Sequence, residues 1–319
     1  MVGMAALGAA VPFSVSIAQA RKVWRIGFLS SELPNAQRYD AFVRGMRDLG
    51  YEEGRNLRID ARYAEGDRVR LARLAAELAE SRVDIIVAAG SYAAGAAKAA
   101  TGSIPIVMGA SSDPVSSGLV ASLARPGGNI TGLSLNAVDV SAKHLELVRT
   151  VVPRAKRVGV LNNPAIPAHL AAVAALEAAA KQLGIAATTV QASSLEEIRH
   201  GFAAMRGAQV QAVIVVVDAF FNAQSPSIAE LAVRYRLPSV FGNREPVEAG
   251  GLLSYGQDLA ASFYRAASYV DRVLKGARPG DLPVEQPLKF DLAVNLRTAK
   301  AVGVTIPRSL LLRADYVIE

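Results

Sequence analysis

Short apolar runs alternate with amphipathic stretches along most of the chain. In the first part, β-rich apolar runs predict strands over 23–30, 57–63, 84–89 and 104–109. Each run is followed by apolar residues at helical spacing, which predict helices over 36–49, 69–80, 92–100 and 114–123. The first helix is expected to stop at Gly50, a residue suited to the C′ position. This alternation predicts an α/β fold with a parallel sheet and helices on both faces.

The same rhythm begins again after a strand predicted over 130–135. A helix over 140–152 opens the second part. It is followed by strands over 157–161, 185–190, 212–217 and 239–241, separated by helices over 165–183, 195–205 and 227–235. The remaining chain predicts a strand over 251–255, a helix over 259–274, a proline-rich stretch ending at Pro287, and a strand and helix over 288–302.

This order of elements predicts two lobes with similar open sheets. The first lobe is expected to contain 21–136 and 256–282, and the second 137–255 and 283–319. The chain then crosses between the lobes three times. The crossings, near Asn136, Tyr255 and 283–287, are expected to form a hinge.

The first 20 residues have the pattern of a secretory signal. They contain no charged side chain, stay apolar through Ile17, and end on Ala18, Gln19 and Ala20, as at a signal peptidase site. The basic residues that usually open such a signal are missing. We interpret 1–20 as a signal cleaved near Ala20, and no later uncharged apolar stretch approaches the roughly 20 residues of a membrane span.

Composition narrows the function classes. With 319 residues, 51% of them hydrophobic and 20% charged, the chain can fill two cores. The absence of cysteine excludes disulfides, thiol nucleophiles and thiolate metal sites. The net charge of +7 does not indicate nucleic acid, because the arginines between Arg44 and Arg73 alternate with Asp and Glu, as on a solvated helical surface.

No catalytic constellation stands out in the sequence. His144, His169 and His200 lie far apart on predicted helices without metal-ligand spacing, so we interpret each as a surface or helix-end residue. Nucleotide and hydrolase motifs are absent, and the glycines at 127, 128 and 132 precede a strand, the wrong order for a dinucleotide fingerprint. We therefore expect no enzymatic activity, no catalytic residue, no metal and no cofactor.

Small polar residues follow the predicted strands, where open α/β sheets bind ligands. The candidate ligand-binding residues are Ser30, Ser31, Ser91, Tyr92, Ser111, Ser112 and Asp113 in the first lobe, Asn162, Asp218 and Asn243 in the second, and Asn136 and Tyr255 at the hinge. Ser91 and Ser112 precede predicted helices and could hold a ligand carboxylate, or simply serve as N-caps. Asp218 ends an apolar strand and could bind an amine; alternatively it caps a helix or pairs with Arg244.

Two longer strings carry a family resemblance: IPIVMGASSDPVSSGLVASLARPGGNITGLS over 104–134, and LKFDLAVNLRTAKAVGVTIPRSLLLRADYVIE over 288–319. With them the chain resembles the ABC-transporter substrate-binding proteins of the tryptophan-binding-protein-like family. The resemblance implies a monomeric type I periplasmic binding protein. Its two Rossmann-like (flavodoxin-like) lobes with parallel sheets are joined by three hinge strands, and it delivers a small solute to an ABC permease.

Some members of that family are linked with aromatic amino acids. The hypothesis is therefore a periplasmic protein that closes around a small amino-acid-like ligand, possibly an aromatic one, with no nucleic-acid partner. Two alternatives stay open: a ligand-sensing module of the same fold that feeds a receptor, and a hydrolase on a doubly wound fold.

Overall fold

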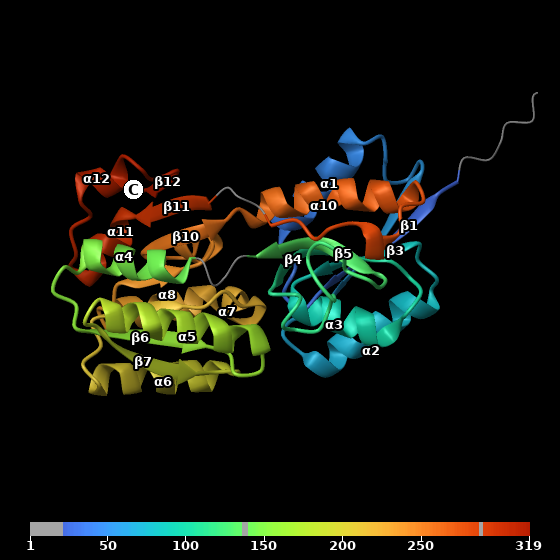
Figure 1. Cartoon of the computed structure of the whole chain (residues 1–319). Coiled ribbons are helices and arrows are strands. Elements are labelled where there is room, and N and C mark those ends of the chain that lie inside the picture. Colours follow the sequence, from blue (N-terminus) through green and yellow to red (C-terminus); the bar gives the residue numbers. More distant parts are fainter. Residues whose placement is uncertain (1–21, 136–139, 287–289) are drawn as a thin grey trace, which may run out of the picture.

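Two lobes lie side by side in the computed structural model, each a β-sheet between two layers of helices (Figure 1). The structure describes residues 22–135, 140–286 and 290–319. The expected signal over 1–20, Asn136 and the end of the proline-rich stretch at Pro287 lie outside these residues. The predicted α/β class with two mostly parallel sheets is confirmed.

The first lobe contains five parallel strands in the order β2-β1-β3-β4-β5. They are β1 (Trp24–Ser30), β2 (Leu57–Tyr63), β3 (Ile85–Ala89), β4 (Ile106–Ser112) and β5 (Ile130–Leu135). Helices α1 (Ala36–Asp48) and α10 (Leu259–Leu274) lie together on one face, and α2 (Arg68–Glu80) and α3 (Ser91–Ala100) cover the other (Figure 1). Side chains alternate between the two layers: Phe28 packs under α1 and α10, while Leu29 packs under α2 and α3.

Local signals explain where these helices begin and end. The Asn35 side chain accepts a hydrogen bond from the Arg38 N–H and caps α1, and Asp67 caps α2 in the same way. Gly50 has φ +86°, and its N–H donates to the Arg47 carbonyl at 2.9 Å. A left-handed φ of this kind favours glycine, so the predicted end of the first helix is confirmed.

The helix predicted over 114–123 is wrong. Residues 114–118 form turns instead, and Asp113 precedes them with φ +37°, outside the helical region. The Asp113 carboxylate accepts a hydrogen bond from the Ser116 N–H at 3.1 Å, and Gly118 also has a positive φ. These local conformations compete with the helix that the apolar spacing predicts.

The second lobe contains seven strands in the order β12-β11-β10-β9-β8-β6-β7. They are β6 (Arg157–Asn162), β7 (Ala186–Gln191), β8 (Ala212–Val215), β9 (Ser239–Phe241), β10 (Leu253–Gln257), β11 (Phe290–Asn295) and β12 (Tyr316–Ile318). Only the β10–β11 pair is antiparallel among these described strands.

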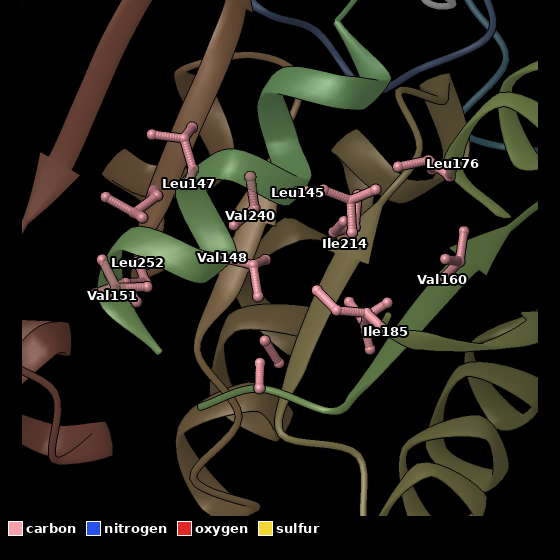
Figure 2. Close-up of a cluster of buried hydrophobic side chains, with 14 of the residues drawn as sticks. Leu145, Leu147, Val148, Val151, Val160, Leu176, Ile185, Ile214, Val240 and Leu252 are labelled. Atoms are coloured by element: carbon pink, nitrogen blue, oxygen red, sulfur yellow. The ribbon is translucent and has the colours of Figure 1, made fainter. Parts of the chain in front are cut away.

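Two hydrophobic clusters hold the helices of the second lobe on opposite faces of its sheet. One face carries α4 (Ser141–Val151), α5 (Pro167–Gln182), α11 (Leu296–Val302) and α12 (Arg308–Leu311); the other carries α6 (Leu195–Gly207), α7 (Ala219–Ala223), α8 (Ser225–Arg234) and α9 (Glu245–Glu248). Figure 2 shows Leu145 and Val148 of α4 next to Ile214 and Val240 of the sheet. Burial of each such side chain contributes about 1.5–3 kcal/mol.

Both sheets contain the same five-strand core. The order β7-β6-β8-β9-β10 repeats the order β2-β1-β3-β4-β5. In each sheet the strands are added along the chain first on one side of the starting strand (β1 or β6) and then on its other side, so the switch point lies between the second and third strands of the order. In doubly wound sheets, ligands bind beyond the carboxyl ends of the strands at this switch point. The fold thus singles out the residues that follow β1 and β3 in the first lobe and β6 and β8 in the second.

The chain passes between the lobes after β5, after β10 and before β11. Before the last crossing, residues 283–286 lie along β5: the Glu285 N–H donates to the Gly132 carbonyl, and the Ser134 N–H donates to the Glu285 carbonyl, each at 2.9 Å. The expected boundary at 283 is therefore too early, because this segment pairs with the open edge of the first sheet.

None of the helices in the described ranges combines the length and the apolar character that crossing a bilayer requires.

Candidate functional site

A cavity lies between the lobes, and its empty volume of about 460 Å³ includes space that is open to solvent. We refer to it as the first cavity. Its charged and hydroxyl-bearing lining consists of Glu32, Arg38, Ser91, Tyr92 and Ser112 from the first lobe and Asp218 from the second. Leu135, Ile166, Val217, Leu259 and Phe263 are the larger apolar side chains around it. The switch points of both sheets therefore face one shared space.

Three serines in the first lobe form a small hydroxyl network. The Ser91 Oγ lies 3.0 Å from the Ser111 Oγ and accepts a hydrogen bond from the Ser112 N–H at 3.0 Å. Ser91 and Ser112 line the first cavity, whereas Ser111 is completely buried beneath them. The alternative that Ser91 and Ser112 are N-caps is wrong, because Gly90 holds the N-cap position of α3 and no helix follows Ser112.

Gly90 shapes the start of α3 at the cavity. Its φ of +92° lies in the region that side chains rarely adopt, and a Cβ there would meet the Ala219 Cβ of the other lobe at 4.0 Å. The turn brings the N-terminus of the ten-residue α3 to the cavity, with Gly90, Ser91 and Tyr92 in its lining. A helix N-terminus favours negative charge, so this edge of the cavity suits an anionic group.

Asp218 provides the opposite chemistry from the second lobe. Only 3% of it is exposed; one carboxylate oxygen accepts from the Phe221 N–H at 2.9 Å, and the other from the Asn163 Nδ2 at 3.2 Å. Burial raises the pKa of Asp218 to about 6, although these donors act to lower it. The cap alternative is confirmed for Asp218, which caps α7, but pairing with Arg244 is wrong, because Arg244 pairs with Glu248. Asp218 also lines the first cavity while it caps the helix.

His169 fixes the loops that carry Asp218 and Asn163. It is 1% exposed; its Nδ1 accepts from the Asn163 N–H at 3.1 Å, and its Nε2 lies 3.0 Å from the Val217 carbonyl, to which it donates. Burial lowers the pKa of His169 to about 4, so the ring is neutral at physiological pH. The segments after β6 and β8 are thus joined through one imidazole.

His144 and His169 are helix-end residues as expected, in the first turns of α4 and α5, but neither lies on the surface. His144 is 5% exposed, and its Nε2 donates to the Tyr255 carbonyl at 2.7 Å. Burial lowers the pKa of His144 to about 4 as well. Both rings lie on the inward side of an amphipathic helix with backbone partners, whereas His200 is exposed as expected. The described residues contain no cluster of three or more acidic or histidine side chains that could hold a metal ion.

An ion cluster that joins the lobes was not predicted from the sequence. Arg38 is 6% exposed; its Nη1 donates to the Glu32 Oε2 at 2.8 Å, and its Nε to the Glu245 Oε1 in the second lobe at 3.1 Å. Burial raises the pKa of Glu32 despite the nearby Arg38. Burial also acts to raise the pKa of Glu245, but Arg38 and Asn243 outweigh this effect, so the pKa is lowered. The signal that could have found this cluster is the position of Glu32 in the loop after β1 and of Arg38 in the first turn of α1, at the switch point.

A second cavity, with an empty volume of about 430 Å³, shares Tyr92 with the first. Ser31, Arg68, Leu71, Asn163 and Phe220 are among the side chains that line it. The Arg68 guanidinium lies over the Tyr92 ring, 4.3 Å from its centroid, and donates to the Tyr92 hydroxyl. Burial, and next the charge of Asp218, raise the pKa of Tyr92 to about 12. Aromatic, apolar and polar groups therefore surround this second space.

The other expected site residues line neither cavity. Ser30, Asp113 and Asn243 make local hydrogen bonds to Glu32, Ser116 and Glu245, respectively. Asn162 is buried with its Oδ1 unpartnered among the described residues, and the neighbouring Asn163 reaches Asp218 instead.

Tyr255 does not lie at a strand end. β10 spans Leu253–Gln257 instead of 251–255, so Tyr255 is inside the strand, where it stacks on Phe290 at 5.6 Å. Asn136 lies outside the described residues.

Comparisons with known proteins agree with this two-lobed arrangement. The sequence profile of the family described as "ABC transporter substrate binding protein" matches residues 32–318. A tyrosine-binding protein of Clostridioides difficile strain R20291 is 31% identical over 264 residues, which cover 82% of this chain and 75% of that protein.

Two solved structures differ in how well they superpose. The ABC domain from Streptococcus pneumonia in complex with L-Trp gives a TM-score of 0.86 at 27% identity, covering 93% of this chain and 100% of that chain. The ligand-free, open structure of a substrate-binding protein from Clostridium difficile gives a TM-score of 0.68 at 29% identity, covering 93% of this chain and 99% of that chain.

Proposed function

Because the chain belongs to the family of ABC transporter substrate-binding proteins and shares their two-lobed type I fold, we propose that it captures an aromatic L-amino acid outside the cytoplasm and delivers it to an ABC importer. Asp218 is the observation that carries the ligand class. This buried carboxylate lines a cavity between the lobes and has a pKa raised to about 6. A ligand ammonium would offset the free-energy cost of burying its charge. The named ligands of the similar proteins, tyrosine and L-Trp, have such an ammonium.

The lining of the two cavities matches the parts of an aromatic amino acid. The ammonium binds Asp218, and the carboxylate binds the hydroxyls of Ser91, at the N-terminus of α3, and Ser112, at the end of β4. The aromatic ring goes beside Tyr92 and Phe220, where rings offer apolar and π surface. Each part of the ligand thus meets a group of complementary chemistry.

Closure of the lobes is the proposed mechanism. The first cavity takes its lining from both lobes, and Arg38 and Glu245 form an ion pair across them. At similar identity, the chain also superposes better on the L-Trp complex than on the ligand-free open structure, with TM-scores of 0.86 and 0.68. These observations support a closed arrangement here. A ligand that touches both lobes stabilises it, with the three crossings acting as the hinge.

The hydrolase alternative would need an acid and a base free to exchange protons with a substrate. Glu32 and Asp218 are the buried carboxylates of the first cavity, but Glu32 pairs with Arg38, and both oxygens of Asp218 accept hydrogen bonds from the chain. Carboxylates held in this way suit the recognition of a cation. We therefore keep the binding function and propose no reaction.

The test is thermal unfolding of protein refolded to remove carried-over ligand, with amino acids, sugars and nucleosides added in turn. A ligand at about 100 times its Kd adds roughly 2.7 kcal/mol, which raises Tm by a few degrees. We expect aromatic L-amino acids to shift the wild type and the control Asp113→Asn, but not Asp218→Asn. Shifts by sugars or nucleosides alone would contradict the proposal.

Export is tested separately by mass spectrometry of the protein recovered from the periplasm. A chain that begins at Arg21 is expected from the cleavage pattern at 18–20. A chain that stays in the cytoplasm with 1–20 attached would contradict the proposed location.

A further inference from the structure

We infer that Arg38 is a further ligand-binding residue, which recognises the carboxylate of the ligand and couples that contact to closure of the lobes. The inference rests on the proposed function, because it assigns a role within the same site. It concerns a residue buried between the lobes and missed by the sequence pattern.

The hydrogen bonds of Arg38 leave one nitrogen unused. Its Nη1 and Nε donate to Glu32 and Glu245, at 2.8 and 3.1 Å. Its Nη2 is buried and has no acceptor within the part of the chain that the structure describes. A buried charged donor without an acceptor is costly. Because Arg38 lines the first cavity, a ligand there can supply the missing acceptor.

A carboxylate is the acceptor that fits best. A guanidinium is planar and permanently charged, and it forms short, charge-assisted hydrogen bonds with carboxylates. The charge around the first cavity defines the rest of the ligand. Two arginines, Arg38 and the Arg68 that lies over Tyr92, face three carboxylates, those of Glu32, Glu245 and Asp218. An acid without an amine would add negative charge to this set. A zwitterion adds none and can place its ammonium at Asp218 and its carboxylate at Arg38.

The same guanidinium connects this contact to closure. Glu245 belongs to α9 of the second lobe, so its pair with Arg38 requires the lobes to be together. The Asn243 Nδ2 holds the other oxygen of Glu245 at 2.6 Å, which leaves Oε1 for Arg38. A ligand carboxylate on Nη2 therefore orients the guanidinium plane toward Glu245. Occupancy and closure then stabilise each other.

The experiment compares L-tyrosine with L-tyrosinamide, which keeps the ring and the amine but lacks the negative charge. Calorimetry would measure both ligands against the wild type, Arg38→Gln, and the control Arg44→Gln, an exposed arginine on the same helix. We expect the wild type and Arg44→Gln to prefer L-tyrosine by about 30-fold or more, the scale of a lost charged partner. In Arg38→Gln the preference should fall to within about threefold.

Two further variants keep the test decisive. If Arg38→Gln does not fold, Arg38→Lys retains the charge without the planar fork, and its preference should fall between the other two. Glu245→Gln should weaken L-tyrosine by a larger factor than L-tyrosinamide, because only the carboxylate contact is coupled to closure through Arg38. An equal loss for the two ligands would contradict that coupling.

A full preference for L-tyrosine in Arg38→Gln or Arg38→Lys would overturn the role of Arg38 and leave the proposed function intact. A wild type that binds neither ligand would overturn both.

Discussion

In the first lobe, hydroxyl groups that exchange hydrogen bonds with one another line the strand ends at the cavity. In the second, the corresponding position holds a buried carboxylate fixed by two donors. The strand order around both switch points is the same. Topology therefore decides where the site lies, whereas the side chains after each strand decide its polarity. One edge suits a negative group and the other a positive one, which gives a zwitterion a single orientation.

The two edges also differ in how rigidly they are held. Asp218 is fixed by Phe221 and Asn163, and Asn163 is in turn held by the buried His169. The Ser91 and Ser112 side contains hydroxyls that can rotate toward a new partner. Substitutions in the second lobe should therefore cost more than those in the first.

The largest effect is expected for Asp218→Ala. Removing one partner of a buried, hydrogen-bonded charge pair costs about 2–5 kcal/mol, so the affinity for L-tyrosine should fall at least roughly 30-fold by calorimetry. Asp113→Ala is the matched control, since Asp113 also follows a strand but lines neither cavity. A loss below threefold would remove Asp218 from the site.

Asp218→Asn separates binding from stability. The folded pKa of about 6 lies above the ordinary 3.8, so the ionised group destabilises the fold at pH values above 6, and this effect is absent below about 3.8. The variant removes the buried charge but keeps a side chain that can cap α7. At pH 7.5 its Tm should equal or exceed that of the wild type while the ligand affinity is lost.

The next largest effect is expected at His169, which holds the loops that carry Asp218 and Asn163. His169→Phe keeps an aromatic ring but leaves the Val217 carbonyl and the Asn163 N–H unpaired, which costs roughly 2 kcal/mol of unfolding free energy. Urea unfolding measures the change. His200→Phe, at an exposed position, should leave the stability unchanged. Equal stability of the two variants would show that His169 does not hold the loops.

A smaller effect is expected from pH. Asp218 binds an ammonium only when it is ionised, so affinity for L-tyrosine should be constant above pH 7 and fall as the pH drops through about 6. At pH 5 the loss should be about tenfold. Calorimetry between pH 5 and 8 measures it. A flat profile in the wild type would place the ammonium elsewhere.

The smallest effect is expected in the first lobe. Ser91→Ala removes one neutral hydroxyl worth about 1 kcal/mol, so affinity should fall by roughly fivefold. Ser116→Ala, an exposed serine in the turn after β4, should bind as the wild type does. If Ser91→Ala costs as much as Asp218→Ala, the contrast between the two edges is wrong.

Strand-end reasoning located part of the site from sequence. Ser91, Ser112, Tyr92 and Asp218 do line the first cavity, because each lies at or just beyond the carboxyl end of a strand near a switch point. Tyr255 does not, since β10 begins two residues later than its apolar run suggests. The strand also ends two residues later than expected, at Gln257, so Tyr255 falls inside it.

The missed residues depend on tertiary contacts. Arg38 and Glu245 are 207 residues apart and meet only because the lobes adjoin, and His169 is buried by packing of α5. Such pairs have no local signature. The helix expected over 114–123 failed for a local reason: the left-handed Asp113 before Pro114 starts a turn that apolar periodicity does not reveal.

The most direct test of the central claim compares L-tyrosine with 3-(4-hydroxyphenyl)propanoate, the same acid without the amine, by calorimetry on ligand-stripped wild type. The account predicts that L-tyrosine binds at least roughly 30-fold more tightly, because only its ammonium satisfies the buried Asp218. Equal binding of the two acids would contradict a site built around that carboxylate.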